Sequence, residues 1–189
     1  QSHAAIQMAL DAGINNLSID LIYGTPSLSD QAFIADLDWI EHYQIKHVSC
    51  YALTVEDKTA LKKSIEKGQI ENIDSEKQAR HFEIVCARLK TMGLEHYEIS
   101  NFAKPGFRSQ HNSHYWSGET YLGLGPSAHS FNTISRQWNI ANNALYIKSI
   151  AQGQLNFEIE LLTEANRYNE YMMTSLRRIE GFDLDLIAA

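Results

Sequence analysis

The chain has 189 residues and a net charge of −7, with 44% hydrophobic and 21% charged residues. This composition is typical of a soluble globular protein with room for one domain and part of a second. The acidic balance argues against nucleic-acid binding, because phosphate backbones select for Lys and Arg. The sequence has neither an apolar stretch of ~18 residues, which could cross a bilayer, nor a signal-peptide pattern, so a cytoplasmic protein is expected.

Three segments in the first half of the chain predict strands. Residues 16–24 (NLSIDLIYG) and 46–54 (KHVSCYALT) are rich in Ile, Leu and Val and are expected to be buried. Residues 96–103 (HYEISNFA) predict a third strand, with Tyr97 and Ile99 on one side.

Helices are expected between these strands. Ser29 or Asp30 caps the first helix, and its apolar face repeats at spacings of three and four: Phe33, Ile34, Leu37, Ile40, Tyr43. A short charged helix over 57–67 ends at Gly68. A longer helix begins at Asp74 or Ser75, with a capping box between Ser75 and Gln78, and ends at Gly93. Its predicted inner face is Ala79, Phe82, Val85, Cys86, Leu89 and Met92.

The second half is less regular. Residues 120–131 predict a short strand that opens into a glycine turn, and 136–140 (RQWNI) predict an edge strand. A helix ending at Gly153 follows, and Thr163 caps a last helix that is expected to run to Gly181. No clear strand is expected after Gln154, where the chain looks like the start of a small helical domain.

Alternating strands and helices predict a parallel α/β sheet with right-handed crossovers. An open doubly wound sheet and part of a β/α barrel both satisfy the pattern. In both architectures, ligands bind at the carboxyl ends of the strands.

Two residue types inside apolar segments bear on function. Asp20 is flanked by Ile19 and Leu21, so its carboxylate either binds a ligand's hydroxyl or ammonium groups or pairs with an internal donor. Cys50 and Cys86 form no CxxC motif, and buried reduced thiols are expected.

The stretch HNSHYW (111–116) places His111 and His114 three residues apart, beside Tyr115 and Trp116. Neutral imidazoles could bind a metal, but packing or surface histidines fit the same pattern. If 109–117 is helical, His111 and Tyr115 share one face. The following YLGLGPSAHS lacks a phosphate-loop motif, and its glycines instead suggest close approach to a bulky ligand.

Four motifs in this order support a family resemblance: SIDLIYGTP, VSCYALTVE, YEISNFAKPGFRSQHNSHYW and YLGLGPSAHSF. They resemble the radical S-adenosylmethionine proteins related to oxygen-independent coproporphyrinogen III oxidase. Within that family they are most similar to the HemW-type haem chaperone branch.

The resemblance implies a partial β/α barrel that carries a 4Fe–4S cluster on a CxxxCxxC loop, with S-adenosylmethionine bound over it. That cysteine motif is not in this sequence, so the cluster ligands are expected outside this chain. The chain also begins with Gln, and we expect a fragment. Residues 1–153 would then be the later strands and helices of the barrel, and residues 154–189 the start of the C-terminal helical domain.

By position in these motifs, the resemblance assigns Asp20, Ala52 and His129 to S-adenosylmethionine binding. It assigns HNSHYW to haem, with His111 as the candidate iron ligand and Tyr115 and Trp116 beside the porphyrin.

The function implied is a chaperone that binds haem and delivers it to acceptor proteins. The alternative is an oxygen-independent coproporphyrinogen III oxidase, which removes propionate carboxyl groups by radical decarboxylation. A structural fragment without a ligand is the third possibility. This chain alone is expected to be inactive as an enzyme. The resemblance leaves peripheral membrane association and the oligomeric state open.

Overall fold

The computed structural model describes residues 1–185, and the chain forms two compact units. Unit 1 comprises Gln1–Ser109, and unit 2 begins at Gln110. The two units are described separately below. No helix in residues 1–185 is both long and apolar enough to cross a membrane.

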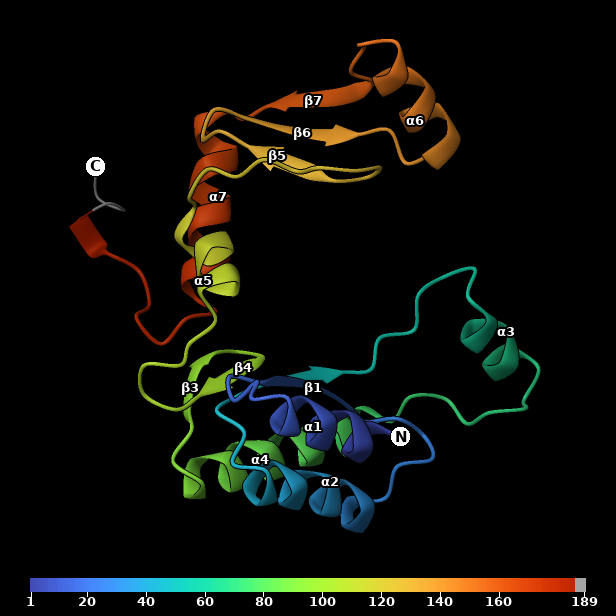
Figure 1. The fold of residues 1–189 in the computed structure, drawn as a ribbon, viewed down its shortest axis with the longest axis vertical. Helices are drawn as coiled ribbons and strands as arrows, with labels where there is room; N and C mark the ends of the chain where they lie inside the picture. The colour runs from blue at the N-terminus through green and yellow to red at the C-terminus, as the bar shows by residue number, and fades with distance from the viewer. Residues whose placement is uncertain (186–189) are drawn as a thin grey trace. The chain divides into compact units, whose positions relative to one another are not determined.

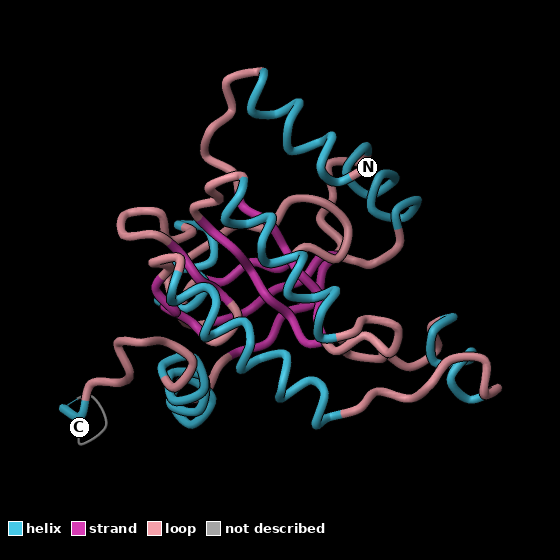
Figure 2. The backbone as a smooth tube through the Cα atoms, turned by 90° about the horizontal axis from the view of Figure 1, so that it is seen from below, coloured by secondary structure: helices cyan, strands magenta, loops and turns pink. Residues whose placement is uncertain are grey.

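Unit 1 has a four-stranded sheet in the order β1-β2-β4-β3, with α2 and α4 on one side and α3 on an excursion away from it (Figures 1 and 2). Its elements are α1 (Ser2–Asp11), β1 (Ser18–Tyr23), α2 (Asp30–His42), β2 (His47–Ala52), α3 (Ala60–Glu66), α4 (Ser75–Thr91), β3 (Glu95–Glu98) and β4 (Asn101–Ala103). The α/β fold class is confirmed, and β1 and β2 are parallel as expected. Helix α1 was not predicted, and none of its residues is buried.

The third predicted strand, over 96–103, is wrong as a single element. The chain turns back at Ile99 and Ser100, so that β4 is antiparallel to both β2 and β3. The buried Glu98 carboxylate causes this turn, because it accepts hydrogen bonds from the Ser100 backbone N (3.1 Å) and from Asn101 Nδ2 (2.6 Å). The sheet is therefore mixed rather than wholly parallel.

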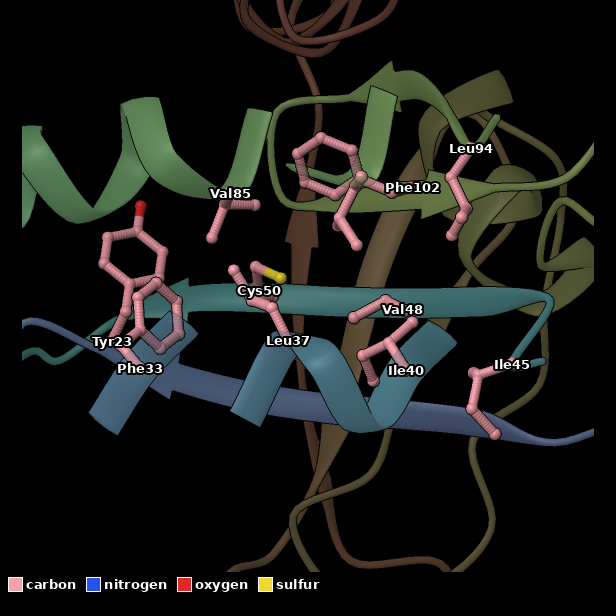
Figure 3. Packing of buried hydrophobic residues seen from close by; sticks show 11 residues of the cluster. Tyr23, Phe33, Leu37, Ile40, Ile45, Val48, Cys50, Val85, Leu94 and Phe102 are labelled. Carbon is pink, nitrogen blue, oxygen red and sulfur yellow. The ribbon is translucent and has the colours of Figure 1, made fainter. Parts of the chain in front are cut away.

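The core of unit 1 lies between the sheet and helices α2 and α4. Figure 3 shows side chains from α2, α4 and the strands meeting in one apolar layer. The predicted face of α2 is confirmed for its three fully buried members, Phe33, Leu37 and Ile40. On α4 the buried residues are His81, Val85 and Leu89, whereas the predicted inner residue Ala79 is exposed. His81 can be buried at this inner position of α4 because both of its ring nitrogens have hydrogen-bond partners.

The helix caps follow the sequence signals with one exception. Ser29 Oγ accepts from Ala32 N, and Asp74 accepts from Glu76 N and Lys77 N. The capping box with Gln78 is absent, because the Gln78 side chain donates to the Leu53 carbonyl instead (2.8 Å).

Unit 2 contains a three-stranded antiparallel sheet, β5-β6-β7, with α5 beside α7 (Figure 1). Its elements are α5 (Gln110–Ser117), β5 (His129–Phe131), β6 (Ser135–Asn139), α6 (Asn143–Ala151), β7 (Phe157–Leu161) and α7 (Glu164–Ser175). Thr163 caps α7 as predicted, by accepting from Asn166 N.

Three predictions in this region were wrong. Residues 136–139 of the predicted edge strand lie in the central strand β6, because β7 follows Gln154 and pairs with β6. Strand β7 was missed because all five of its residues are exposed, so it has no alternation of buried and exposed positions that would predict a strand. Helix α7 ends at Ser175 instead of running to Gly181. The domain boundary at residues 153 and 154 stays a prediction about the family's architecture, and residues 186–189 lie outside the described part.

Candidate functional site

The face of the unit 1 sheet that the helices leave uncovered is polar. Alternation along β1 and β2 turns Leu21 and Val48 toward the helices and Asp20 and Ser49 to the opposite face. The strand register places Asp20 beside Ser49, and Ser49 beside Asn101 of β4. A row of polar groups therefore crosses three neighbouring strands.

Asp20 is exposed on this face, which corrects the expectation that it lies in a wholly buried strand. Strand β1 alternates between exposed and partly buried residues, because it ends the sheet and only one of its faces meets helices. Among residues 1–185, Asp20 has no hydrogen-bond donor. Because the exposed carboxylate can be hydrated, it needs no internal donor, and ligand binding by Asp20 stays a prediction.

A chain of hydrogen bonds closes one end of the polar face. His47 Nδ1 lies 2.6 Å from Ser18 Oγ, and His47 Nε2 lies 2.8 Å from Tyr97 Oη. Tyr97 Oη also accepts from Ser109 N at 3.2 Å. Burial lowers the pKa of His47, although the nearby negative charge of Asp20 opposes that shift. The neutral imidazole thus joins β1, β2 and β3 across the sheet.

The carboxyl ends of β1 and β2 are held by the first turns of α4. Gly24 N donates to His81 Nδ1 (3.2 Å), and His81 Nε2 lies 3.0 Å from Asp30 Oδ1. Leu53 N donates to the Tyr23 carbonyl (2.9 Å). Ala52, the predicted cofactor contact at this end, is exposed and pairs in register with Tyr23. Asp20 and Ala52 thus belong to adjacent strands of one firmly held sheet.

Neither cysteine suits an iron–sulfur cluster. Both thiols are free, and burial raises the pKa of Cys50 to about 12, with smaller contributions from Cys86 and Asp20. Burial also raises the pKa of Cys86. Within residues 1–185, no group of three His, Cys, Asp or Glu side chains could hold a metal ion.

In unit 2, the HNSHYW stretch forms α5, as the helical interpretation of 109–117 predicted. The rings of His111 and Tyr115 meet edge to face at 5.0 Å, and Tyr115 meets Tyr121 at 4.9 Å. His111 itself is exposed. His114 points elsewhere and lies 3.7 Å from Glu119 Oε2. His111, rather than His114, is therefore the imidazole joined to the aromatic residues.

A cavity of about 360 Å³ lies in unit 2 beside Tyr115 and Trp116. Its aromatic lining is completed by residues from the glycine turn, β5 and α7: Tyr121, Phe131, Tyr171. Three guanidinium groups, from Arg136, Arg167 and Arg178, also line it. The cavity has the size and mixed apolar and polar lining of a small-molecule site.

The glycine turn after α5 is tightly packed at one point. A Cβ on Gly123 would lie 2.1 Å from the His129 carbonyl oxygen, so no other residue fits there without movement. The predicted cofactor contact His129 is exposed, and its ring lies 5.9 Å from that of Trp138. The close contact at Gly123 is therefore formed with the backbone of His129 in the same chain.

Sequence reasoning missed several residues of these sites. His47, Ser49 and Tyr51 alternate along one strand, and that period of two could have revealed the polar face. Arg167, Tyr171 and Thr174 recur at spacings of four and three on α7, which marks one helix face. Phe131 and Arg136 reach the cavity through the pairing of β5 with β6, which no local pattern encodes.

Comparison with known proteins gives a consistent result. The chain is 34% identical over 187 residues to the haem chaperone HemW of Mycobacterium tuberculosis, which covers 98% of this chain and 48% of that protein. It is 32% identical over 178 residues to HemW of Bacillus subtilis, covering 94% and 47%. A zebrafish (Danio rerio) mitochondrial protein, radical S-adenosyl methionine domain-containing protein 1, is 34% identical over 113 residues, covering 60% and 26%.

Among solved structures, coproporphyrinogen III oxidase (HemN) from Escherichia coli, described as a radical SAM enzyme, matches with a TM-score of 0.72 and 18% identity. The match covers 93% of this chain and 43% of that structure, and it establishes the fold. No family model matches the sequence. The chain spans about half the length of the HemW relatives above, and over that span it is a homologue of the HemW-type branch of the radical SAM proteins.

Proposed function

We propose that the protein containing this chain is a haem chaperone, which binds haem and passes it to acceptor proteins. The single observation that carries this proposal is the unit 2 cavity, in which Tyr115 and Trp116 of the HNSHYW stretch form part of an aromatic wall. Relatives named as haem chaperones align along almost the whole chain.

The chemistry of unit 2 suits a flat apolar ligand with an iron centre. Aromatic rings favour contact with the face or edge of another π system. His111 packs against Tyr115 and is exposed, so its imidazole is accessible to iron. Because histidine is a common axial ligand of haem iron, His111 is the iron ligand in this proposal.

S-adenosylmethionine would use unit 1 in the same proposal. Asp20 offers a carboxylate without a hydrogen-bond donor among the described residues, which suits the hydroxyl or ammonium groups of that cofactor. Ala52 lies at the end of the neighbouring strand and is the second contact in this proposal. When bound to a cluster, S-adenosylmethionine would supply radical chemistry, and in this proposal the cluster ligands come from outside this chain.

Haem titration of the intact protein tests the proposal. The Soret band should shift on binding to the wild type, and the His111→Ala variant should lose or alter that shift with an unchanged circular dichroism spectrum. His114→Ala is the matched control, because His114 lies in the same helix but contacts Glu119 instead of the aromatic residues.

An identical Soret spectrum and affinity for the wild type and His111→Ala would remove His111 from the site. Turnover of coproporphyrinogen III by the intact, cluster-loaded protein would instead favour the oxidase alternative. We expect no such turnover.

A further inference from the structure

Three buried side-chain donors in unit 2 lack a hydrogen-bond partner among residues 1–185, and two of them line the unit 2 cavity. Trp116 Nε1 and Arg178 Nε are both inaccessible to solvent, and neither has a hydrogen-bond partner among residues 1–185. Buried donors in folded proteins are nearly always satisfied, by the protein itself, by water or by a ligand. Both residues line the same cavity, so a ligand with acceptor atoms there would satisfy both donors.

The charges around the cavity favour an anionic acceptor. Arg136 is paired with Glu170 (2.9 Å), and Glu119 lies near His114 (3.7 Å). Arg167 and Arg178 have no carboxylate partner in the part of the chain described. The basic residues after position 110 are few, namely Arg136, Lys148, Arg167, Arg177 and Arg178, and three of these five line the cavity. Glu119 and Glu170 line the cavity as well, so the lining has three arginines against two glutamates, and Arg136 is paired with Glu170. The positive charges left for a ligand are therefore those of Arg167 and Arg178.

Helix α7 and the segment after it supply these groups. Arg167, Tyr171 and Thr174 lie on one face of α7, and Arg178 lies in the segment that follows the end of the helix at Ser175. Arg177, by contrast, lies over the Trp116 ring at 4.8 Å. Tyr171 and Trp116 place apolar surface beside the free guanidinium groups, and lower local polarity strengthens their hydrogen bonds to an anion.

We propose that Arg167 and Arg178, with the indole NH of Trp116, bind the carboxylates of the ligand in this cavity. Guanidinium groups present paired N–H donors that match the two oxygens of a carboxylate. The inference rests on the proposed haem function and deepens it, because the two propionates are the anionic groups of haem. The site therefore selects porphyrins with free propionates, independently of iron ligation by His111.

The test compares haem with haem dimethyl ester, in which both propionates are capped, on the intact protein in matched detergent solution. The wild type should bind haem at least about tenfold more tightly than the ester, since charge-assisted hydrogen bonds are lost. Arg167→Gln and Arg178→Gln should each weaken haem binding by about tenfold and leave binding of the ester unchanged. Lys148→Gln removes the same charge outside the cavity lining and should leave both affinities unchanged.

The possible outcomes separate this inference from the proposed function. Equal binding of haem and ester by the wild type, or haem preference unchanged in both arginine variants, overturns the carboxylate site and leaves haem binding standing. Equal weakening of haem and ester in the arginine variants assigns the arginines a structural role and also overturns it. No Soret change with the wild type overturns the proposed function and this inference together.

Discussion

The role of the Asp20 carboxylate depends on which face of β1 the helices of unit 1 cover. A carboxylate in the middle of a buried Ile- and Leu-rich strand predicts either a pair or a ligand, but on the exposed face of β1 it can be hydrated, and its role as a ligand contact stays a prediction. The sequence alone could not decide this, because it does not show which face of the short strand packs against the helices.

Replacing Asp20 by Asn or Ala should weaken S-adenosylmethionine binding by the cluster-loaded intact protein. The loss of one charge-assisted hydrogen bond is worth about 1.5–3 kcal/mol. Isothermal calorimetry measures the affinity, and Asp38→Asn on the surface of α2 is a control for the lost charge. Unchanged affinity in both Asp20 variants would exclude this residue from the cofactor site.

His47 makes the stability of unit 1 depend on pH. Burial holds its pKa below the unfolded value of 6.5, so the unfolded state binds the proton more readily. The stabilising contribution of the neutral imidazole is complete above pH 6.5 and is lost as pH falls from there through the folded pKa.

Urea unfolding of the wild type and His47→Gln between pH 7.5 and 5 measures this contribution. Gln keeps a donor and an acceptor without titrating, so the wild type should lose more unfolding free energy than the variant over that range. Parallel curves for the two proteins would show that His47 does not titrate between the folded and unfolded states.

At the scale of elements, the sequence predicted those whose signals are local. Ser29, Asp74 and Thr163 cap helices through their own side chains, and the apolar spacing of α2 survives in its buried residues. The β3–β4 hairpin was missed because Glu98 fixes it from a buried position. An acidic residue in a strand-like segment gives no local indication that it stabilises a turn.

Gly123→Ala should destabilise the sheet of unit 2. The new Cβ would meet the His129 carbonyl group, which is backbone and cannot rotate away, and such overpacking costs about 1–3 kcal/mol. Amide exchange in β6 reports the loss. Gly106→Ala is a control in unit 1, where no atom lies within 4 Å of the new Cβ but the φ of +81° strains any side chain, and it should leave β6 unchanged. Equal β6 protection in the Gly123 variant and the wild type would contradict the close contact.

At the scale of the whole chain, the two units differ in how much apolar surface they bury. Of the buried hydrophobic residues among those described, only Leu162 belongs to unit 2, and the rest are in unit 1. The sequence predicted the α/β class, since alternating strands and helices are evident in the first half. It could not predict the boundary after Ser109, because HNSHYW follows the preceding turn without a change in composition.

We therefore expect β2 to be the more protected strand in hydrogen-exchange mass spectrometry. Local opening free energies rise with the number of buried apolar contacts, and β2 has four buried residues whereas β7 has none. Peptides from β2 should exchange at least ~10-fold more slowly than those from β7. Comparable rates for the two strands would mean that the units open together.

Strand β1 ends the unit 1 sheet, with Ile22 55% exposed. An unpaired strand edge offers backbone N–H and C=O groups to any extended segment that meets it. Purified on its own at high concentration, the chain should therefore be prone to form reversible aggregates by strand addition. A lysine in place of Ile22 should suppress this self-association, which light scattering would detect as a shift to smaller particles.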